Sequence, residues 1–127
     1  MMDKGGVEVI CKNSEYCCPI STALDLIGGK YKALILWHLT DSTLRFGELQ
    51  RLISQATPKM LSQQLRELER AEIVIRTVYP TVPPKVEYSL TDLGKSMKPI
   101  LDIMYSWGAE YLLSIGKEAN CSMSTFD

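Results

Sequence analysis

The sequence has a single histidine, and its four cysteines do not follow the spacing of a metal site. Zinc sites need Cys or His side chains at short, regular intervals, so no metal ion is expected. The sequence also contains no Gly-rich phosphate loop and no histidine positioned to serve a catalytic triad. His38 lies in an apolar segment, and we interpret it as a core residue rather than a catalytic one. The sequence therefore predicts neither an enzyme nor a bound cofactor.

Long hydrophobic runs are also lacking. No segment is apolar over the length that a bilayer requires, and the first residues, Met1–Gly6, lack the basic and apolar segments of a signal peptide. We therefore expect a cytoplasmic protein with no membrane contact. In that reducing compartment the cysteines, which are Cys11, Cys17, Cys18 and Cys121, are expected to be thiols rather than disulfides. The length of 127 residues fits one domain.

Charge is nearly balanced overall, with a net value of −1, but it is unevenly placed. Residues 30–98 contain eleven Lys and Arg against seven Asp and Glu, a balance of +4, whereas the remainder contains three against eight, a balance of −5. A basic centre with acidic flanks fits a surface that faces DNA. An ordinary solvated surface gives similar counts, so the charge pattern leaves both interpretations open.

Apolar spacing predicts a mainly helical chain. Helices are expected over residues 19–27, where Gly28 and Gly29 end the pattern, and over residues 30–39 and 45–53. Thr57 and Pro58 suit the cap and the first position of a fourth helix that runs to Ala71. This fourth helix has two different faces. Leu61, Leu65 and Leu68 form an apolar stripe, and the opposite face carries Lys59, Ser62, Gln63, Arg66 and Arg70.

The second half of the chain predicts a β-hairpin and a long helix. Residues 73–78 and 85–90 read as two strands joined by a loop with three prolines. Thr91 then caps a helix from Asp92 to Ile115, which Pro99 should kink or divide. The apolar face of this helix is too broad for the surface of a monomer, so we expect it to form a dimer interface together with the first helix.

Two short helices joined by a tight turn, followed by a hairpin, are typical of a winged helix-turn-helix. The predicted fold class is thus mainly α with a small β-hairpin wing (α+β), dimeric through its terminal helices. Residues 18–115 form the winged helix-turn-helix domain, 1–17 an N-terminal arm and 116–127 a C-terminal tail. The fold predicts a transcriptional regulator that binds double-stranded DNA as a homodimer. Winged helices also serve as protein-interaction modules without DNA readout, and this alternative stays open.

The candidate DNA contacts follow from the major-groove code. Arg66 is suited to guanine acceptors and Gln63 to adenine, while Lys59 and Ser62 are suited to bases or phosphates. Other basic residues are placed to neutralise phosphates or to enter the minor groove, and these are Arg45, Arg76 and Lys85. Each of them, taken singly, is equally well explained as a solvated charge. Their shared face favours the DNA-binding interpretation.

Three strings give the chain a family resemblance: RFGEL at residues 45–49, KMLSQQLREL at 59–68 and VPPKVEYSLT at 82–91. They resemble the HxlR family of bacterial regulators, and the resemblance extends from Cys18 to Leu113. It implies a MarR-like winged-helix fold, an obligate dimer built from the terminal helices and a pseudo-palindromic operator. The sequence departs from the family at Gln55-Ala56-Thr57, where a Gly-Ile-Ser type of turn is more usual. The form of the turn and the base preference are therefore open.

The resemblance also bears on one cysteine. In some members of the family the cysteine before the first proline senses oxidants or electrophiles, and Cys18 occupies the matching position. A thiol at a helix N-terminus faces the positive end of the helix dipole, which lowers its pKa. The alternative is that Cys18 only caps or packs against the helix. Whether the regulator has a small-molecule effector is left open by the sequence.

Overall fold

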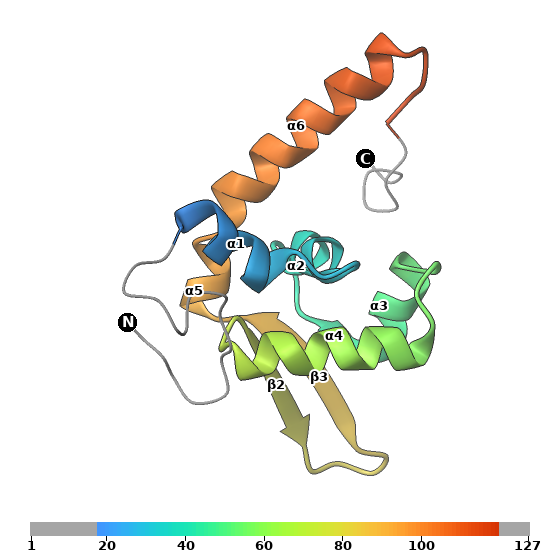
Figure 1. The fold of residues 1–127 in the computed structure, drawn as a ribbon. Coiled ribbons are helices and arrows are strands. Elements are labelled where there is room, and N and C mark those ends of the chain that lie inside the picture. Colours follow the sequence, from blue (N-terminus) through green and yellow to red (C-terminus); the bar gives the residue numbers. More distant parts are fainter. Residues whose placement is uncertain (1–17, 120–127) are drawn as a thin grey trace.

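The computed structural model describes residues 18–119, which form six helices and three strands. In chain order these are α1 (Pro19–Ile27), α2 (Lys32–Leu39), β1 (Leu44–Arg45), α3 (Phe46–Leu52), α4 (Pro58–Arg70), β2 (Val74–Tyr79), β3 (Lys85–Leu90), α5 (Asp92–Lys95) and α6 (Lys98–Ser114). The wing and α6 project from opposite ends of a body formed by α1 to α4 (Figure 1). The architecture confirms the predicted mainly α fold with a hairpin wing.

The core is centred on α2 and α4. Ile35 and Leu36 of α2 are completely buried, and so are Leu61 and Leu68 of α4. Burying each side chain of this size stabilises the fold by about 1.5–3 kcal/mol. His38 is a core residue, as the sequence predicts, and its burial lowers the pKa of its imidazole.

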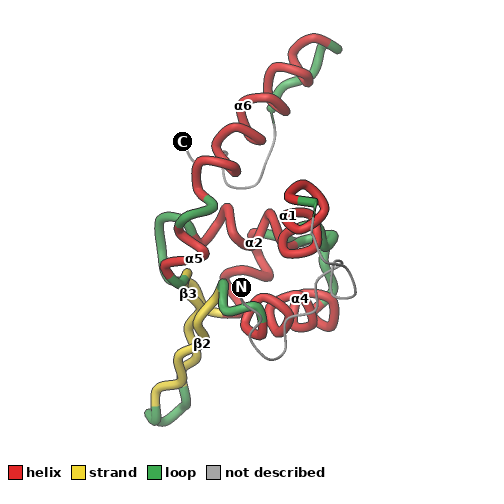
Figure 2. Tube along the Cα trace, turned by 60° about the vertical axis from the view of Figure 1, so that its left-hand side comes forward, coloured by secondary structure: helices red, strands yellow, loops and turns green. Residues whose placement is uncertain are grey.

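The strands form one antiparallel sheet in the order β1-β3-β2. Figure 2 shows its β2–β3 hairpin in yellow, extending from the helices as the wing. The hairpin register runs from Val74 opposite Leu90 to Tyr79 opposite Lys85. The sequence prediction missed β1, whose Leu44 and Arg45 pair with Tyr88 and Glu87 of β3. Arg45 is therefore a strand residue that immediately precedes α3, not the first residue of that helix.

The last predicted helix is divided in two. Pro99 lies in the first turn of α6, and Ser96 and Met97 separate that helix from α5. Proline is favoured at such a position because its missing N–H would lack a helical partner there in any case.

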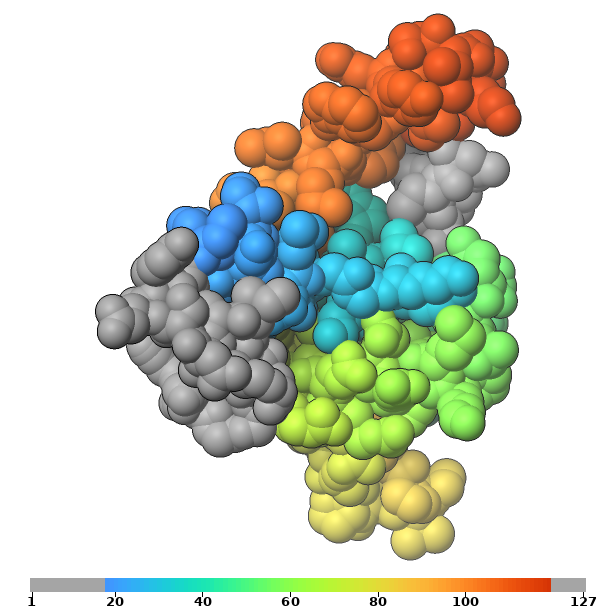
Figure 3. Space-filling view, in the orientation of Figure 1, coloured from blue at the N-terminus to red at the C-terminus, as the bar shows by residue number. Residues whose placement is uncertain are grey.

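The space-filling view shows α6, in orange and red, standing away from the body (Figure 3). Leu101 is its only buried residue, and Tyr105 of α6 stacks on Trp37 of α2 with ring centroids 5.1 Å apart. Between residues 18 and 119, no helix has the length and apolar character that a membrane span requires.

Candidate nucleic-acid interface

The outer face of α4 carries most of the predicted base-reading side chains. The helix begins as predicted, because Thr57 Oγ1 accepts a hydrogen bond from the backbone N–H of Met60 at 3.1 Å and Pro58 opens the first turn. The apolar stripe packs into the core, which turns the opposite face to solvent. That face exposes Lys59, Gln63, Arg66 and Arg70 and leaves Ser62 half-buried.

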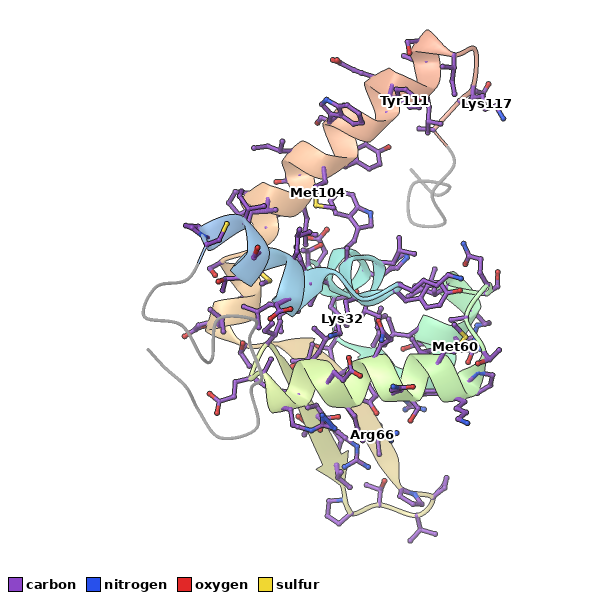
Figure 4. The ribbon with its side chains drawn as sticks, viewed as in Figure 1. Lys32, Met60, Arg66, Met104, Tyr111 and Lys117 are labelled. Carbon is purple, nitrogen blue, oxygen red and sulfur yellow. The ribbon has the colours of Figure 1, made fainter. Side chains whose placement is uncertain are left out.

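Side chains on this face contact one another along the helix. The Arg66 guanidinium donates to Ser62 Oγ at 3.2 Å, and Gln63 Nε2 donates to Glu67 Oε2 at 3.5 Å. Arg66 lies on the side of α4 that faces the wing (Figure 4). The polar groups of α4 thus form a row of donors and acceptors of the kind that recognises base edges and phosphates.

The turn before α4 is held by one side chain from α3 and one from Tyr31, the residue that precedes α2. Gln50 Nε2 of α3 donates to the carbonyl oxygen of Ala56 at 2.6 Å, and the Tyr31 hydroxyl donates to the carbonyl oxygen of Gln55 at 3.3 Å. Ala56 itself is buried. The Gln55-Ala56-Thr57 variant of the turn is therefore held by two side-chain hydrogen bonds to its backbone carbonyl groups.

The residues predicted to contact phosphates differ in how exposed their side chains are and in whether a carboxylate lies nearby. Arg76 is exposed on β2. Lys85 is half-buried, with Nζ 3.6 Å from Glu87 Oε2 and 4.6 Å from the centre of the Tyr79 ring. The charge of Glu87, which also accepts a hydrogen bond from Tyr79, raises the pKa of that phenol. Arg45 is exposed on β1 with Glu87 as its cross-strand partner. Lys85 is thus paired with a carboxylate, whereas Arg76 and Arg45 are exposed.

An ion pair between a buried lysine of α2 and a half-buried glutamate of α4 was missed by the sequence analysis. Lys32 Nζ of α2 lies 2.8 Å from Glu67 Oε1 of α4, and the Lys32 side chain is only 11% exposed. The hydrogen bond from Lys32 is the main cause that lowers the pKa of the Glu67 carboxyl. Periodicity places Lys32 on a helix but does not indicate a partner on another helix, so no sequence signal could have found this pair.

Cys18 lies apart from the α4 face. It is the residue before α1, whose start is on the side of the molecule away from the wing (Figure 1). The thiol is exposed, and hydrogen bonds from the backbone and the side chain of Ser21, followed by the backbone of Ile20, lower its pKa. Cys11, Cys17 and Cys121 lie outside the described residues. Within residues 18–119, no cluster of three or more His, Cys, Asp or Glu side chains is placed to hold a metal ion.

The helices predicted to form the dimer interface expose large apolar side chains. On α1, Ile20 and Leu24 are 70% and 61% exposed. On α6, Ile103 and Trp107 are each 69% exposed, and Trp107 stacks on Tyr111 with ring centroids 5.8 Å apart. The sequence predicts an apolar face on this helix that includes Ile100, Met104 and Tyr111. Ile103 and Trp107 lie beside that face, so the exposed apolar surface of α6 is wider than expected.

Comparison with known proteins gives consistent results. The HxlR-like helix-turn-helix family model matches residues 26–115. The chain is 49% identical over 100 residues to the helix-turn-helix-type transcriptional regulator YdeP of Bacillus subtilis, which covers 79% of this chain and 78% of YdeP. It is 50% identical over 99 residues to a helix-turn-helix-type transcriptional regulator of Methanothermobacter thermautotrophicus, covering 78% of this chain and 76% of that protein.

Solved structures agree with these relatives. The oxidised form of the redox regulator HypR matches with a TM-score of 0.70 at 49% identity, covering 72% of this chain and 94% of that one. The reduced form of the transcriptional regulator YodB from B. subtilis matches with a TM-score of 0.66 at 35% identity, covering 76% and 94%. These proteins are regulators, not enzymes, which confirms the prediction that the chain has no enzymatic role.

Proposed function

Because this chain belongs to the HxlR-like helix-turn-helix family and is a transcriptional regulator of that type, we propose that it binds double-stranded DNA as a homodimer. The proposal rests on one observation above all, the two-faced helix α4. Its leucines are buried in the core while Lys59, Gln63 and Arg66 are exposed together on the outer face. A helix of this kind fits the major groove of B-DNA.

The proposed contacts divide into two groups. Gln63 and Arg66 read base edges, and Lys59 and Ser62 contact bases or phosphates. Arg45, Arg76 and Lys85 neutralise phosphates on either side of the groove or reach the minor groove. Among these three, Arg76 and Arg45 are exposed, whereas the Lys85 ammonium is partly neutralised by the nearby Glu87 carboxylate. We therefore expect Lys85 to contribute the least to DNA affinity.

The exposed apolar faces of α1 and α6 support the proposed homodimer. A large apolar surface that is rimmed by polar residues marks a protein interface. We propose that residues 18–115 act as one winged helix-turn-helix unit and that two copies join through these helices. A two-fold dimer places its two α4 helices about one turn of DNA apart, which requires a pseudo-palindromic operator.

A gel-shift titration at two salt concentrations tests the proposal, using an operator selected from a random DNA pool. A protein that neutralises six to ten phosphates loses about 10³- to 10⁵-fold in affinity between 50 and 200 mM salt, because binding releases counterions. The same steep decrease is expected here. Binding that scarcely depends on salt would instead favour the alternative function, a protein-interaction module.

We further propose that Cys18 makes DNA binding sensitive to thiol oxidants. Its exposure and its lowered pKa favour the reactive thiolate, and the similarity to the redox regulator HypR supports the same function. The thiolate adds to the N=N bond of diamide, and a second thiol, from the other subunit or from a small molecule, then attacks the sulfur of this adduct. A disulfide forms, and the reduced hydrazine leaves. Because Cys18 adjoins the proposed interface, the disulfide should change the angle between the two subunits and hence the spacing of the α4 helices.

The redox proposal is tested by treating the protein with diamide and measuring operator affinity. We expect reversible weakening and an adduct on Cys18 detected by mass spectrometry. Cys18→Ser should bind normally and ignore the oxidant, whereas Cys11→Ser and Cys121→Ser should respond like the parent. If Cys18→Ser is as sensitive as the parent, or if the thiol reacts with alkylating agents as a group with a pKa of about 8.5 would, Cys18 is only a cap.

A further inference from the structure

The buried Lys32 connects α2 to the outer face of α4. Lysine is almost never buried without a partner, and the partner here is Glu67, whose Oε1 lies 2.8 Å from Lys32 Nζ. The other oxygen of the same carboxylate, Oε2, accepts a long hydrogen bond of 3.5 Å from Gln63 Nε2. Three side chains thus form a chain of contacts that begins in the core and ends on the exposed face of α4.

The backbone around Lys32 is fixed against α4. The backbone N–H of Tyr31 donates to Gln64 Oε1 of α4 at 3.3 Å. A Cβ on Gly29 would collide with that same Gln64 oxygen, so the absence of a side chain at Gly29 allows the turn to approach the helix. Figure 4 shows Lys32 between α2 and α4, on the side of α4 away from Arg66. Lys32 therefore holds Glu67 from a rigid position.

The chemistry of the contact fixes the orientation of the Gln63 amide. An ionised carboxylate can only accept hydrogen bonds, so the amide must turn its NH₂ group, and not its oxygen, toward Glu67. One N–H of that NH₂ is directed to Glu67. The second N–H and the amide oxygen of Gln63 itself remain side by side on the other edge of the amide. This remaining pair of one donor and one acceptor matches N7 and the N6 amino group of adenine in the major groove.

We propose that Lys32 and Glu67 are positioning residues that orient the Gln63 amide for reading adenine. The inference rests on the proposed function, in which α4 lies in the major groove. Lys32 holds the carboxylate, the carboxylate selects one of the two amide orientations, and the selected orientation determines which base is preferred. Without the pair, the amide is free to rotate by half a turn and to present the reversed edge, which does not match adenine.

A purely structural ion pair would have different consequences. It would change the stability of the fold and the affinity for every DNA sequence by the same factor. Positioning of Gln63 instead changes the preference among bases at one operator position. The preference at that position is therefore the readout that separates the two roles.

The test uses four operator duplexes that differ only at the base pair where Gln63→Ala loses discrimination. Lys32→Met is expected to lower the preference for A·T at this position about five- to tenfold, approaching the effect of Gln63→Ala. The double variant Lys32→Met/Gln63→Ala should lose no more preference than Gln63→Ala alone. Lys32→Arg, which keeps the charge and the donors, should restore most of the preference.

Lys30→Met is the matched control. Lys30 lies two positions earlier and is exposed, with Nζ 5.5 Å from the centre of the Tyr31 ring. Its substitution removes the same charge and leaves the contacts among Lys32, Glu67 and Gln63 in place. The control should lower affinity for all four duplexes by the same small factor. Should Lys32→Met unfold, Glu67→Gln replaces it. Because Lys32 can only donate, the new amide keeps its oxygen toward Lys32 and turns its NH₂ group toward Gln63, which selects the reversed orientation of the Gln63 amide and should lower the A·T preference.

Three results would overturn the inference. The first is an unchanged A·T preference in Lys32→Met and in Glu67→Gln when both are folded. The second is an equal loss of affinity on all four duplexes, which indicates a structural ion pair. The third is that Gln63→Ala changes no base preference anywhere in the operator. This result would refute base reading by Gln63 itself, and with it the positioning of its amide.

Discussion

Helices α4 and α6 both carry many apolar residues, but they place them in opposite environments. In α4 the three leucines that face the core are at most 1% exposed, and the polar residues face solvent. In α6 only Leu101 is buried, while Ile103, Trp107 and Leu113 are each 69% exposed. The apolar face of α4 is therefore buried within the chain itself, whereas α6 exposes apolar side chains to solvent that a second surface can cover.

This difference shows how one small chain presents two kinds of outer surface. The outer face of α4 exposes polar and basic groups, which suit a charged, hydrated partner such as DNA. The end with α6 exposes aromatic and aliphatic groups, which suit an interface that excludes water. The following predictions test whether the two helices differ in this way.

The largest effect is expected from emptying the core behind α4. Leu65→Ala should lower the free energy of unfolding by about 2–5 kcal/mol, because a buried leucine leaves a cavity. Leu113→Ala on α6 is the matched control and should change it by less than about 0.5 kcal/mol at concentrations where the chain is monomeric. Urea denaturation measures both. Equal losses would mean that the α6 face is packed within the chain after all.

Breaking the α6 face should release monomers. Trp107→Glu and Ile103→Glu place a charge in the proposed interface, and each should weaken dimerisation by about 2 kcal/mol or more, roughly thirtyfold. Sedimentation velocity across a concentration series gives the dissociation constant. Val82→Glu adds the same charge at the wing tip, where the side chain is 99% exposed, and should leave the dimer unchanged. A dimer that tolerates both α6 variants would place the interface elsewhere.

Substitutions on the outer face of α4 are expected to change DNA affinity and to leave dimerisation unchanged. Arg66→Ala and Gln63→Ala should each cost about 1–3 kcal/mol on the cognate operator and relax the base preference. Lys85→Ala should weaken binding to all sequences by a similar factor and reduce the salt dependence. Competition with random DNA separates the two signatures. Identical losses on operator and random DNA for all three variants would show that α4 does not read bases.

The smallest effect is expected at the start of α4. Thr57→Ala removes the oxygen that accepts from the Met60 N–H and should cost about 1 kcal/mol in the free energy of unfolding. Thr57→Ser keeps the hydroxyl and should retain most of that stability. Denaturation curves for the pair isolate the cap, and an equal loss in both variants would assign the effect to the missing methyl group instead.

The predicted elements that proved correct are those whose signals are local. The start of α4 follows from Thr57 and Pro58, whose cap chemistry involves residues only three positions apart. The division between α5 and α6 follows from Pro99, which suits the first turn of a helix far better than its interior. Local signals of this kind also placed the polar residues on the outer face of α4.

The features that the sequence did not predict depend on distant partners. Strand β1 has only two residues, and it exists because Leu44 lies opposite Tyr88 in β3. The burial of Lys32 depends on Glu67 of another helix, and a charged residue at a helix start is normally expected in solvent. The exposure of Trp107 depends on how far α6 projects from the body, which no periodicity specifies.

The chain's two tryptophans lie in different surroundings, and this makes them independent optical reporters. Trp37 is partly buried and stacked on Tyr105, so its emission should change when α6 leaves α2 or when the core unfolds. Trp107 is exposed on the far part of α6, so its emission should shift toward the blue when a second surface covers it. Recording Trp107→Phe and Trp37→Phe separately would then resolve dissociation from unfolding in one titration, with no attached dye.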